Sequence, residues 1–378
     1  MTGNRLQDLH DAGQSIWLDF IDRTLLLDGR LERMIRDDAL VGMTSNPTIF
    51  EKALAEGTAY DGQIASAAGE RSALELFELI ETDDVRTACD QFRDTYERTK
   101  RRDGYVSIEV SPAHAHSASD TIEEAHRLWR TVDRPNVMVK VPGTVAGATA
   151  VRRLIADGIN VNITLLFSLD AHARVIEAYL AGLEDRVAAA ASIDACASVA
   201  SFFVSRVDSE VDRRLDAKAA TMGGDDGGEP VLALRGKAAV ANARRAYALF
   251  RERFAGRRWE ALAARGGMVQ RPLWASTSTK NPAYRDVIYV EQLIGPDTVN
   301  TLPPATMDAF RHHGVVEQTV DHDLDASARH VEALAQLGID FQAVADQLLE
   351  DGLAAFQKSF DGLIAGLERK AASLVPSR

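Results

Sequence analysis

Lys140 is the residue whose surroundings most clearly point to chemistry. It lies in residues 136–142, Asn-Val-Met-Val-Lys-Val-Pro, an otherwise apolar run that predicts a buried strand. Moving an ammonium group out of water is costly, so a lysine among apolar neighbours tends to lose its proton, and the neutral amine can attack a carbonyl carbon. Two alternatives stay open: Lys140 reaches solvent at a sheet edge, or it forms a buried ion pair.

The elements that must position this lysine alternate along the chain. Short apolar or β-branched runs are followed by longer segments of helical pattern, which is typical of a parallel α/β fold. The predicted strands are residues 15–21, 40–46, 105–111, 136–142, 160–167, 197–204, 271–276 and 298–302. Eight such repeats in a chain of 378 residues favour a (β/α)8 TIM barrel. A doubly wound open sheet is the alternative, but residues 19–23 after the first strand lack the glycines of a dinucleotide loop.

We expect residues 1–378 to form a single barrel domain with three additions. A helical insertion at about 47–104 separates the second and third strands, and a helical segment at about 327–372 follows the barrel. The C-terminal helices could cover a barrel mouth or pack on the outer wall. The third addition is an acidic Gly-rich loop at about 222–229, which lacks the Gly-Lys-Ser or Gly-Lys-Thr ending of a phosphate loop.

One face of each early strand is polar. Successive side chains on a strand point to opposite faces, so parity separates the barrel lumen from the side that meets the helices. The polar face holds Asp19 of the first strand, Thr44 and Asn46 of the second, Ser107, Glu109 and Ser111 of the third, Lys140 of the fourth, and Asn160, Asn162 and Thr164 of the fifth. The opposite face is apolar, as with Val137, Val139 and Val141. We therefore expect the polar residues inside the barrel, where branched apolar side chains are usual.

Position along the strand also favours a functional site. Barrels of this type place their active sites at the carboxyl ends of the strands. The residues in the later half of their strands are Asp19, Asn46, Glu109, Lys140 and Thr164. A lysine that can form a Schiff base and two carboxylates that can move protons are the equipment of a class I aldolase. Taken singly, Asp19 or Glu109 could be structural carboxylates, Thr44 or Asn46 could cap the next helix, and Thr164 could be an ordinary strand residue. Their coincidence on one predicted face favours a functional site.

Three motifs in these strands resemble the transaldolase family. They are residues 42–50, Gly-Met-Thr-Ser-Asn-Pro-Thr-Ile-Phe; residues 139–144, Val-Lys-Val-Pro-Gly-Thr; and residues 158–168, Gly-Ile-Asn-Val-Asn-Ile-Thr-Leu-Leu-Phe-Ser. The resemblance extends from about residue 15 to residue 302. It implies a (β/α)8 barrel with the Schiff-base lysine on the fourth strand and no metal or organic cofactor.

The resemblance also implies a reaction and its catalytic residues. A dihydroxyacetone unit would pass from sedoheptulose 7-phosphate to glyceraldehyde 3-phosphate, giving erythrose 4-phosphate and fructose 6-phosphate, in the non-oxidative pentose phosphate pathway. Lys140 would form the Schiff base, and Asp19 would take the proton from the C4 hydroxyl as the C3–C4 bond breaks. Glu109 and Thr164 would hold a water that relays protons.

The substrate-binding residues follow from the same resemblance. Asn46 and Ser201 would bind the hydroxyls of the three-carbon unit with Thr44 and Asn162 in support, and the phosphate would be bound by Arg206, Ser276 and Lys280. Many relatives carry Arg where Lys280 aligns, and a lysine holds phosphate only as a point charge.

Phe203 separates the transaldolase reading from one alternative. It matches a Phe of transaldolases, whereas fructose 6-phosphate aldolases are shorter and carry Tyr, whose hydroxyl can assist release of the fragment. The alternatives are therefore an aldolase-like lyase of that kind and a barrel that binds sugar phosphates without turnover.

Composition limits the classes of partner. The net charge of -13 argues against nucleic acid and anionic membranes, since few cations remain to neutralise phosphates. Cys89 and Cys196 are far apart in sequence and fit no metal or redox spacing. The N-terminus lacks an apolar signal core, and no apolar stretch is long enough to span a membrane, so we expect a cytoplasmic protein. Its oligomeric state stays open between monomer and homodimer.

Overall fold

The eight strands of the chain close into a parallel barrel. The computed structural model describes residues 4–67, 69–222 and 228–374. The strands pair in chain order, and the first also pairs with the last. They are β1 (Gln14–Asp19), β2 (Leu40–Thr44), β3 (Tyr105–Glu109), β4 (Val137–Pro142), β5 (Val161–Leu166), β6 (Ser198–Phe203), β7 (Arg271–Ala275) and β8 (Thr298–Leu302). The predicted TIM barrel is confirmed, and the open sheet is excluded.

The helices surround the strands and also supply the additions. Before β3 lie α1 (Arg5–Asp11), α2 (Arg23–Leu27), α3 (Arg30–Asp37), α4 (Pro47–Glu56), α5 (Asp61–Ala67), α6 (Ala73–Gln91) and α7 (Arg93–Arg98). Between β3 and β7 lie the short 3-10 helix η1 (Pro112–His114), α8 (Ala118–Val132), α9 (Val145–Asp157), α10 (Leu169–Ala188), α11 (Ser205–Thr221), α12 (Glu229–Leu232), α13 (Ala238–Arg253) and α14 (Gly256–Ala263). After β7 come α15 (Ile288–Glu291), α16 (Pro304–His313), α17 (Leu324–Gln336) and α18 (Phe341–Leu374).

The predicted additions correspond to particular elements. Helices α4 to α7 lie between β2 and β3, and α17 and α18 follow the barrel. Residues 223–227 of the predicted Gly-rich loop lie outside the described residues, and its last residue, Glu229, begins α12.

Polar residues cap the helices that follow β4 and β5, at the carboxyl ends of these strands. Thr144 follows β4 and accepts a hydrogen bond from the backbone N–H of Gly147, while Ser168 follows β5 and accepts one from Ala171. Each cap satisfies a backbone donor that the first turn of a helix leaves unpaired. These caps fix where the strands end, and therefore where their last lumenal side chains stand.

The lumen is closed below the predicted site. Trp17 has the same strand parity as Asp19 and is fully buried, and a Cβ on Gly42 would lie only 2.5 Å from its indole nitrogen. Gly42 is therefore required for the ring to fit across the barrel. Beneath it, the Arg271 guanidinium donates to Ser15 at 2.7 Å and to Asp103 at 2.9 Å, which fills the lower lumen with a buried ion pair.

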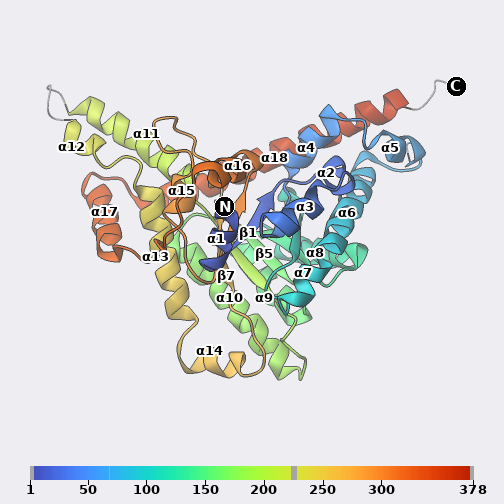
Figure 1. Ribbon diagram of the computed structural model, residues 1–378, viewed down its shortest axis with the longest axis horizontal. Coiled ribbons are helices and arrows are strands. Elements are labelled where there is room, and N and C mark those ends of the chain that lie inside the picture. The colour runs from blue at the N-terminus through green and yellow to red at the C-terminus, as the bar shows by residue number, and fades with distance from the viewer. Residues whose placement is uncertain (1–3, 68, 223–227, 375–378) are drawn as a thin grey trace.

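Strand β5 departs from strict alternation near its end. Leu165 adopts a left-handed φ of 60°, and the pairing of β5 with β6 shifts register between Ile163 and Leu166. Strict alternation along β5 would place Leu165 on the helix-facing side with Val161 and Ile163. Its side chain instead meets α18, where a Cβ on Gly352 would lie 2.9 Å from Leu165 Cδ2. Helix α18 crosses from α11 to α4 and α5, as Figure 1 shows along the upper edge of the view.

Candidate active site

A cavity of about 180 Å³ opens at the carboxyl ends of the strands. All but two of the predicted site residues line it. They are Asp19, Thr44, Asn46, Lys140, Thr164, Ser201, Phe203, Arg206, Ser276 and Lys280. Phe356 of α18 also lines it, so this helix covers the mouth, which decides between the two positions left open for the C-terminal helices.

The Lys140 amine is held at the bottom of the cavity. The residue is only 5% exposed, and its Nζ donates to the backbone carbonyl of Ser45 at 2.9 Å and to Glu109 Oε2 at 3.0 Å. Lys140 therefore forms the buried ion pair that was one of the alternatives, and it lines the cavity while Glu109 lies outside the lining. An ammonium paired in this way can pass its proton to the neighbouring carboxylate and become nucleophilic.

The pKa values of the two carboxylates Glu109 and Asp19 are both raised, which favours their protonated forms. Burial raises the pKa of Glu109, and the nearby Lys140 charge offsets this only in part. Burial likewise raises the pKa of Asp19 against the opposing effects of Lys140 and the Thr44 hydroxyl. A carboxylate whose pKa lies closer to neutrality is a better proton acceptor at the pH of the cell.

Thr44 and Asn46, at and just after the end of β2, were both possible helix caps, and the structure gives them different contacts. The Thr44 hydroxyl lies 2.9 Å from Asp19 Oδ1 and 2.7 Å from Thr301 Oγ1, so Thr44 orients the carboxylate and does not cap a helix. Asn46 caps α4, because its Oδ1 accepts from the backbone N–H of Ile49 at 3.1 Å. The cap uses only the oxygen, so the Asn46 amide group at the cavity wall still has its donors.

A chain of buried polar groups holds the side of the cavity formed by β5 and β6. Ser201 Oγ donates to Asn162 Oδ1 at 2.6 Å, and Asn162 Nδ2 donates to Ser107 Oγ at 3.0 Å. Asn162 does not line the cavity and acts on it through Ser201. Thr164 differs, because its buried hydroxyl has no hydrogen-bond partner among the described residues. A buried hydroxyl is rarely left unpaired, so Thr164 is available to water or substrate.

Positive charge collects at the other end of the cavity. The Arg206 guanidinium lies 5.3 Å from the centre of the Phe203 ring, and Lys280 Nζ donates to Ser278 Oγ at 2.7 Å. Burial lowers the pKa of both cations, and neither forms a salt bridge with another described residue. Ser276 adopts a φ of 54°, and its hydroxyl lies 3.1 Å from that of Ser205. Two uncompensated cations suit a phosphate group.

Several contributors were not predicted. The Ser45 carbonyl that binds Lys140 is a backbone group and leaves no side-chain signal. Ser107 was placed on the lumenal face without a role, and Thr301 could have been found because it has the same lumenal parity. Phe356 of α18 lies more than 50 residues past the end of the last strand, and no local pattern indicates its contact with the cavity.

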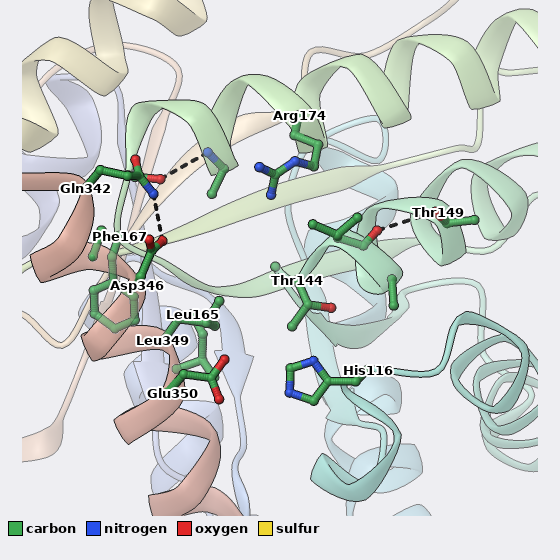
Figure 2. Close-up of a pocket in the computed structure, with 16 residues that line it drawn as sticks. His116, Thr144, Thr149, Leu165, Phe167, Arg174, Gln342, Asp346, Leu349 and Glu350 are labelled. Carbon is green, nitrogen blue, oxygen red and sulfur yellow. Dashed lines mark hydrogen bonds between the residues drawn. The ribbon is translucent and has the colours of Figure 1, made fainter.

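A larger cavity of about 520 Å³ lies between α18 and the first turns of α9 and α10. In Figure 2, His116 and Thr144 lie across from Asp346 and Glu350 of α18. None of Lys140, Asp19 and Glu109 lines this cavity, so it is separate from the candidate active site.

Within the described ranges no group of three or more His, Cys, Asp or Glu side chains could hold a metal ion. In the same part of the chain no helix is long and apolar enough to cross a membrane.

Comparison with known proteins gives one consistent result. The model of the transaldolase/fructose-6-phosphate aldolase family matches residues 16–367. A protein of Trichodesmium erythraeum named transaldolase is 45% identical over 379 residues, covering 100% of both chains. A protein of Thermobifida fusca with the same name is 47% identical over 373 residues, covering 98% of this chain and 99% of its own.

Proposed function

The chain belongs to the transaldolase/fructose-6-phosphate aldolase family, and we propose that it acts as a transaldolase. It transfers a dihydroxyacetone unit from sedoheptulose 7-phosphate or fructose 6-phosphate to glyceraldehyde 3-phosphate or erythrose 4-phosphate, as in the non-oxidative pentose phosphate pathway. The observation that carries the proposal is the Lys140 amine, buried 3.0 Å from Glu109 in a cavity that Asp19, Arg206 and Lys280 also line.

The first half of the reaction attaches and cleaves the donor. Neutral Lys140 attacks the C2 carbonyl carbon of the ketose phosphate, and loss of water from the adduct leaves a protonated Schiff base. Asp19 then accepts the proton of the C4 hydroxyl while the C3–C4 bond breaks. The bonding electrons move into the Schiff base, so the aldose phosphate leaves and a three-carbon enamine stays on Lys140.

The second half reverses these steps with a different aldose. The enamine carbon attacks the carbonyl carbon of the acceptor, and Asp19 returns its proton to the new alkoxide. Water then hydrolyses the Schiff base and frees Lys140. Glu109 and the Thr164 hydroxyl, which has no partner in the described part of the chain, are suited to hold that water, because one accepts and the other can donate or accept.

The substrate is held along the cavity. Asn46 and Ser201 bind the hydroxyls of the three-carbon unit, while Arg206, Ser276 and Lys280 bind the phosphate. Phe203 presents a ring without a hydroxyl beside Arg206, so it offers no proton to the enamine. This favours transfer over release of free dihydroxyacetone.

Borohydride reduction in the presence of fructose 6-phosphate tests the Schiff base. Mass spectrometry should find a reduced three-carbon adduct on Lys140 and none in Lys140→Met. An adduct on another lysine, or no adduct in the unaltered protein, contradicts the proposal.

A second measurement separates transfer from cleavage. With fructose 6-phosphate and erythrose 4-phosphate, glyceraldehyde 3-phosphate and sedoheptulose 7-phosphate should form together. Accumulation of free dihydroxyacetone would instead support the aldolase-like lyase, and Phe203→Tyr is expected to move the protein in that direction.

The cellular setting is also a proposal. Cys89 and Cys196 are buried and free, which suits a reducing, cytoplasmic compartment. Monomer and homodimer are the expected states, and light scattering after size-exclusion chromatography distinguishes them.

A further inference from the structure

The two phosphate-binding cations stand on different segments. Arg206 lies in the first turn of α11, whereas Lys280 lies in residues 276–287, which join β7 to α15. A phosphate can be gripped by both only if these segments keep a fixed separation. The stem of a lysine is flexible, so its position depends on the loop that carries it.

The loop is ordered partly by its own contacts. The Thr279 hydroxyl donates to the carbonyls of Arg285 at 3.0 Å and Asp286 at 3.1 Å. Asn281 accepts through Oδ1 from the backbone N–H of Ala283 at 3.0 Å. These bonds make residues 279–286 a compact unit, but they do not attach it to α11.

The start of the loop is bonded to α11, because the Ser205 backbone N–H donates to the Ser276 carbonyl at 3.0 Å. A tyrosine supplies a second attachment, which holds the unit of residues 279–286. The Tyr284 hydroxyl donates to Asp212 Oδ2 at 2.6 Å, and the other oxygen of Asp212 accepts from the backbone N–H of Gly236 at 2.9 Å. Asp212 stands on α11 six residues after Arg206, about 9 Å along the helix. Burial and the Asp212 carboxylate raise the pKa of Tyr284 to about 12, so its hydroxyl stays a donor at neutral pH.

Gly236 completes the contact. It has a φ of 67°, and a Cβ there would lie 2.7 Å from the Tyr284 ring. The ring therefore packs directly on backbone that only glycine readily provides. Three segments that are distant in sequence meet at one carboxylate: α11, the turn between α12 and α13, and the loop of Lys280.

We infer that Tyr284 and Asp212 are positioning residues for phosphate recognition, holding Lys280 opposite Arg206. The inference rests on the proposed function for the identity of the substrate. It assigns no contact with substrate to either residue. Their effect passes through Lys280, and it concerns binding of the phosphate end and not the chemistry at Lys140.

A double-variant comparison tests this. Tyr284→Phe should raise the KM for fructose 6-phosphate and the dissociation constant of inorganic phosphate by about threefold to tenfold, with kcat near that of the unaltered protein. Asp212→Asn should act in the same direction, because it leaves one carbonyl oxygen where two donors need acceptors. In the Lys280→Ala background, Tyr284→Phe should add little, because the residue it positions is gone.

The control is Tyr247→Phe, which removes a tyrosine hydroxyl bonded to the Pro296 carbonyl at 3.0 Å, away from the phosphate end. It should leave phosphate affinity unchanged. The inference is overturned if Tyr284→Phe and Asp212→Asn bind phosphate normally, or if their effect adds in full to that of Lys280→Ala. Phosphate affinity is measured by calorimetry, so it is readable even if no transfer activity is found and the proposed function fails.

Discussion

The two ends of the candidate site are built in different ways. At the reactive end, Lys140, Glu109 and Thr164 stand on neighbouring strands whose ladder fixes them, with Glu109 directly paired to Lys140 in the β3–β4 register. At the proposed phosphate end, Arg206 lies in the first turn of α11, and Lys280 lies in a loop beyond β7. Lys140 and Glu109 are buried and paired with each other, whereas Arg206 and Lys280 have no carboxylate partner among the described residues.

In the proposed reaction, strand residues therefore carry the bond-making chemistry, and residues outside the strands bind the phosphate. A strand holds its side chains through backbone hydrogen bonds on both sides, so the reactive geometry is set before substrate arrives. Loop-borne cations can instead change without disturbing the barrel. Substitutions at the first end should therefore change kcat, and those at the second should change KM.

The largest effect is expected at Asp19. Asp19→Asn removes the base for C4, so kcat should fall by about 10²- to 10⁴-fold. Schiff-base formation does not need this base, so borohydride should now trap the intact six-carbon substrate on Lys140. Asp28→Asn, at an exposed position before α3, is the matched control. A three-carbon adduct in Asp19→Asn would mean that another group cleaves the bond.

At the phosphate end, Arg206→Ala should raise the KM for fructose 6-phosphate by about tenfold to a hundredfold, with a smaller change in kcat. Arg174→Ala is the same substitution at an exposed arginine beside the larger cavity, and its KM should stay unchanged. If the two variants behave alike, the phosphate is bound elsewhere.

Acid should lower the stability of the folded protein through His172, which packs against the barrel strand β6. This residue is fully buried on α10 against Phe202, neither ring nitrogen has a described partner, and burial lowers its pKa to about 4. The unfolded chain binds the proton near pH 6.5, so stability present above that pH is lost as the pH falls toward 4.

At pH 5 the loss amounts to about 2 kcal/mol relative to pH 8. Urea unfolding at the two pH values should show this component in the unaltered protein and in the exposed control His312→Leu. His172→Leu should lack it. Parallel pH dependence in all three proteins would show that His172 does not titrate as its burial requires.

The smallest effect is expected for Lys280→Arg. A guanidinium can bind two phosphate oxygens where an ammonium acts as a point charge, so the KM for fructose 6-phosphate should fall by about twofold to threefold. Kinetics at saturating acceptor measure it. A rise in KM would mean that the loop around Tyr284 is shaped for the shorter lysine head group.

Prediction from the sequence succeeded where the two-residue alternation of strand side chains decides which residues face the lumen. Strand parity placed Lys140, Glu109, Thr44 and Asp19 on one lumen, and the structure brings them together. Parity failed at Leu165, because a single left-handed residue redirects its side chain to α18.

Helix boundaries are harder to predict where a helical pattern contains a local break. Residues 85–101 have one continuous helical pattern, but α6 ends at Gln91 and α7 begins at Arg93. Contacts across long sequence separations, such as Phe356 with the cavity and Tyr284 with Asp212, follow from the folded path and not from any local pattern. The single-domain boundary and the site roles stay predictions.

The indole of Trp17 has a kinetic consequence. The ring lies across the barrel beneath the cavity, and Arg271 with Asp103 fills the space below, so the cavity is closed at this end. In the proposed reaction both aldoses bind in this one cavity, which Phe356 borders. We therefore expect ping-pong kinetics, in which the first aldose departs before the second binds and the two aldoses compete for the same position.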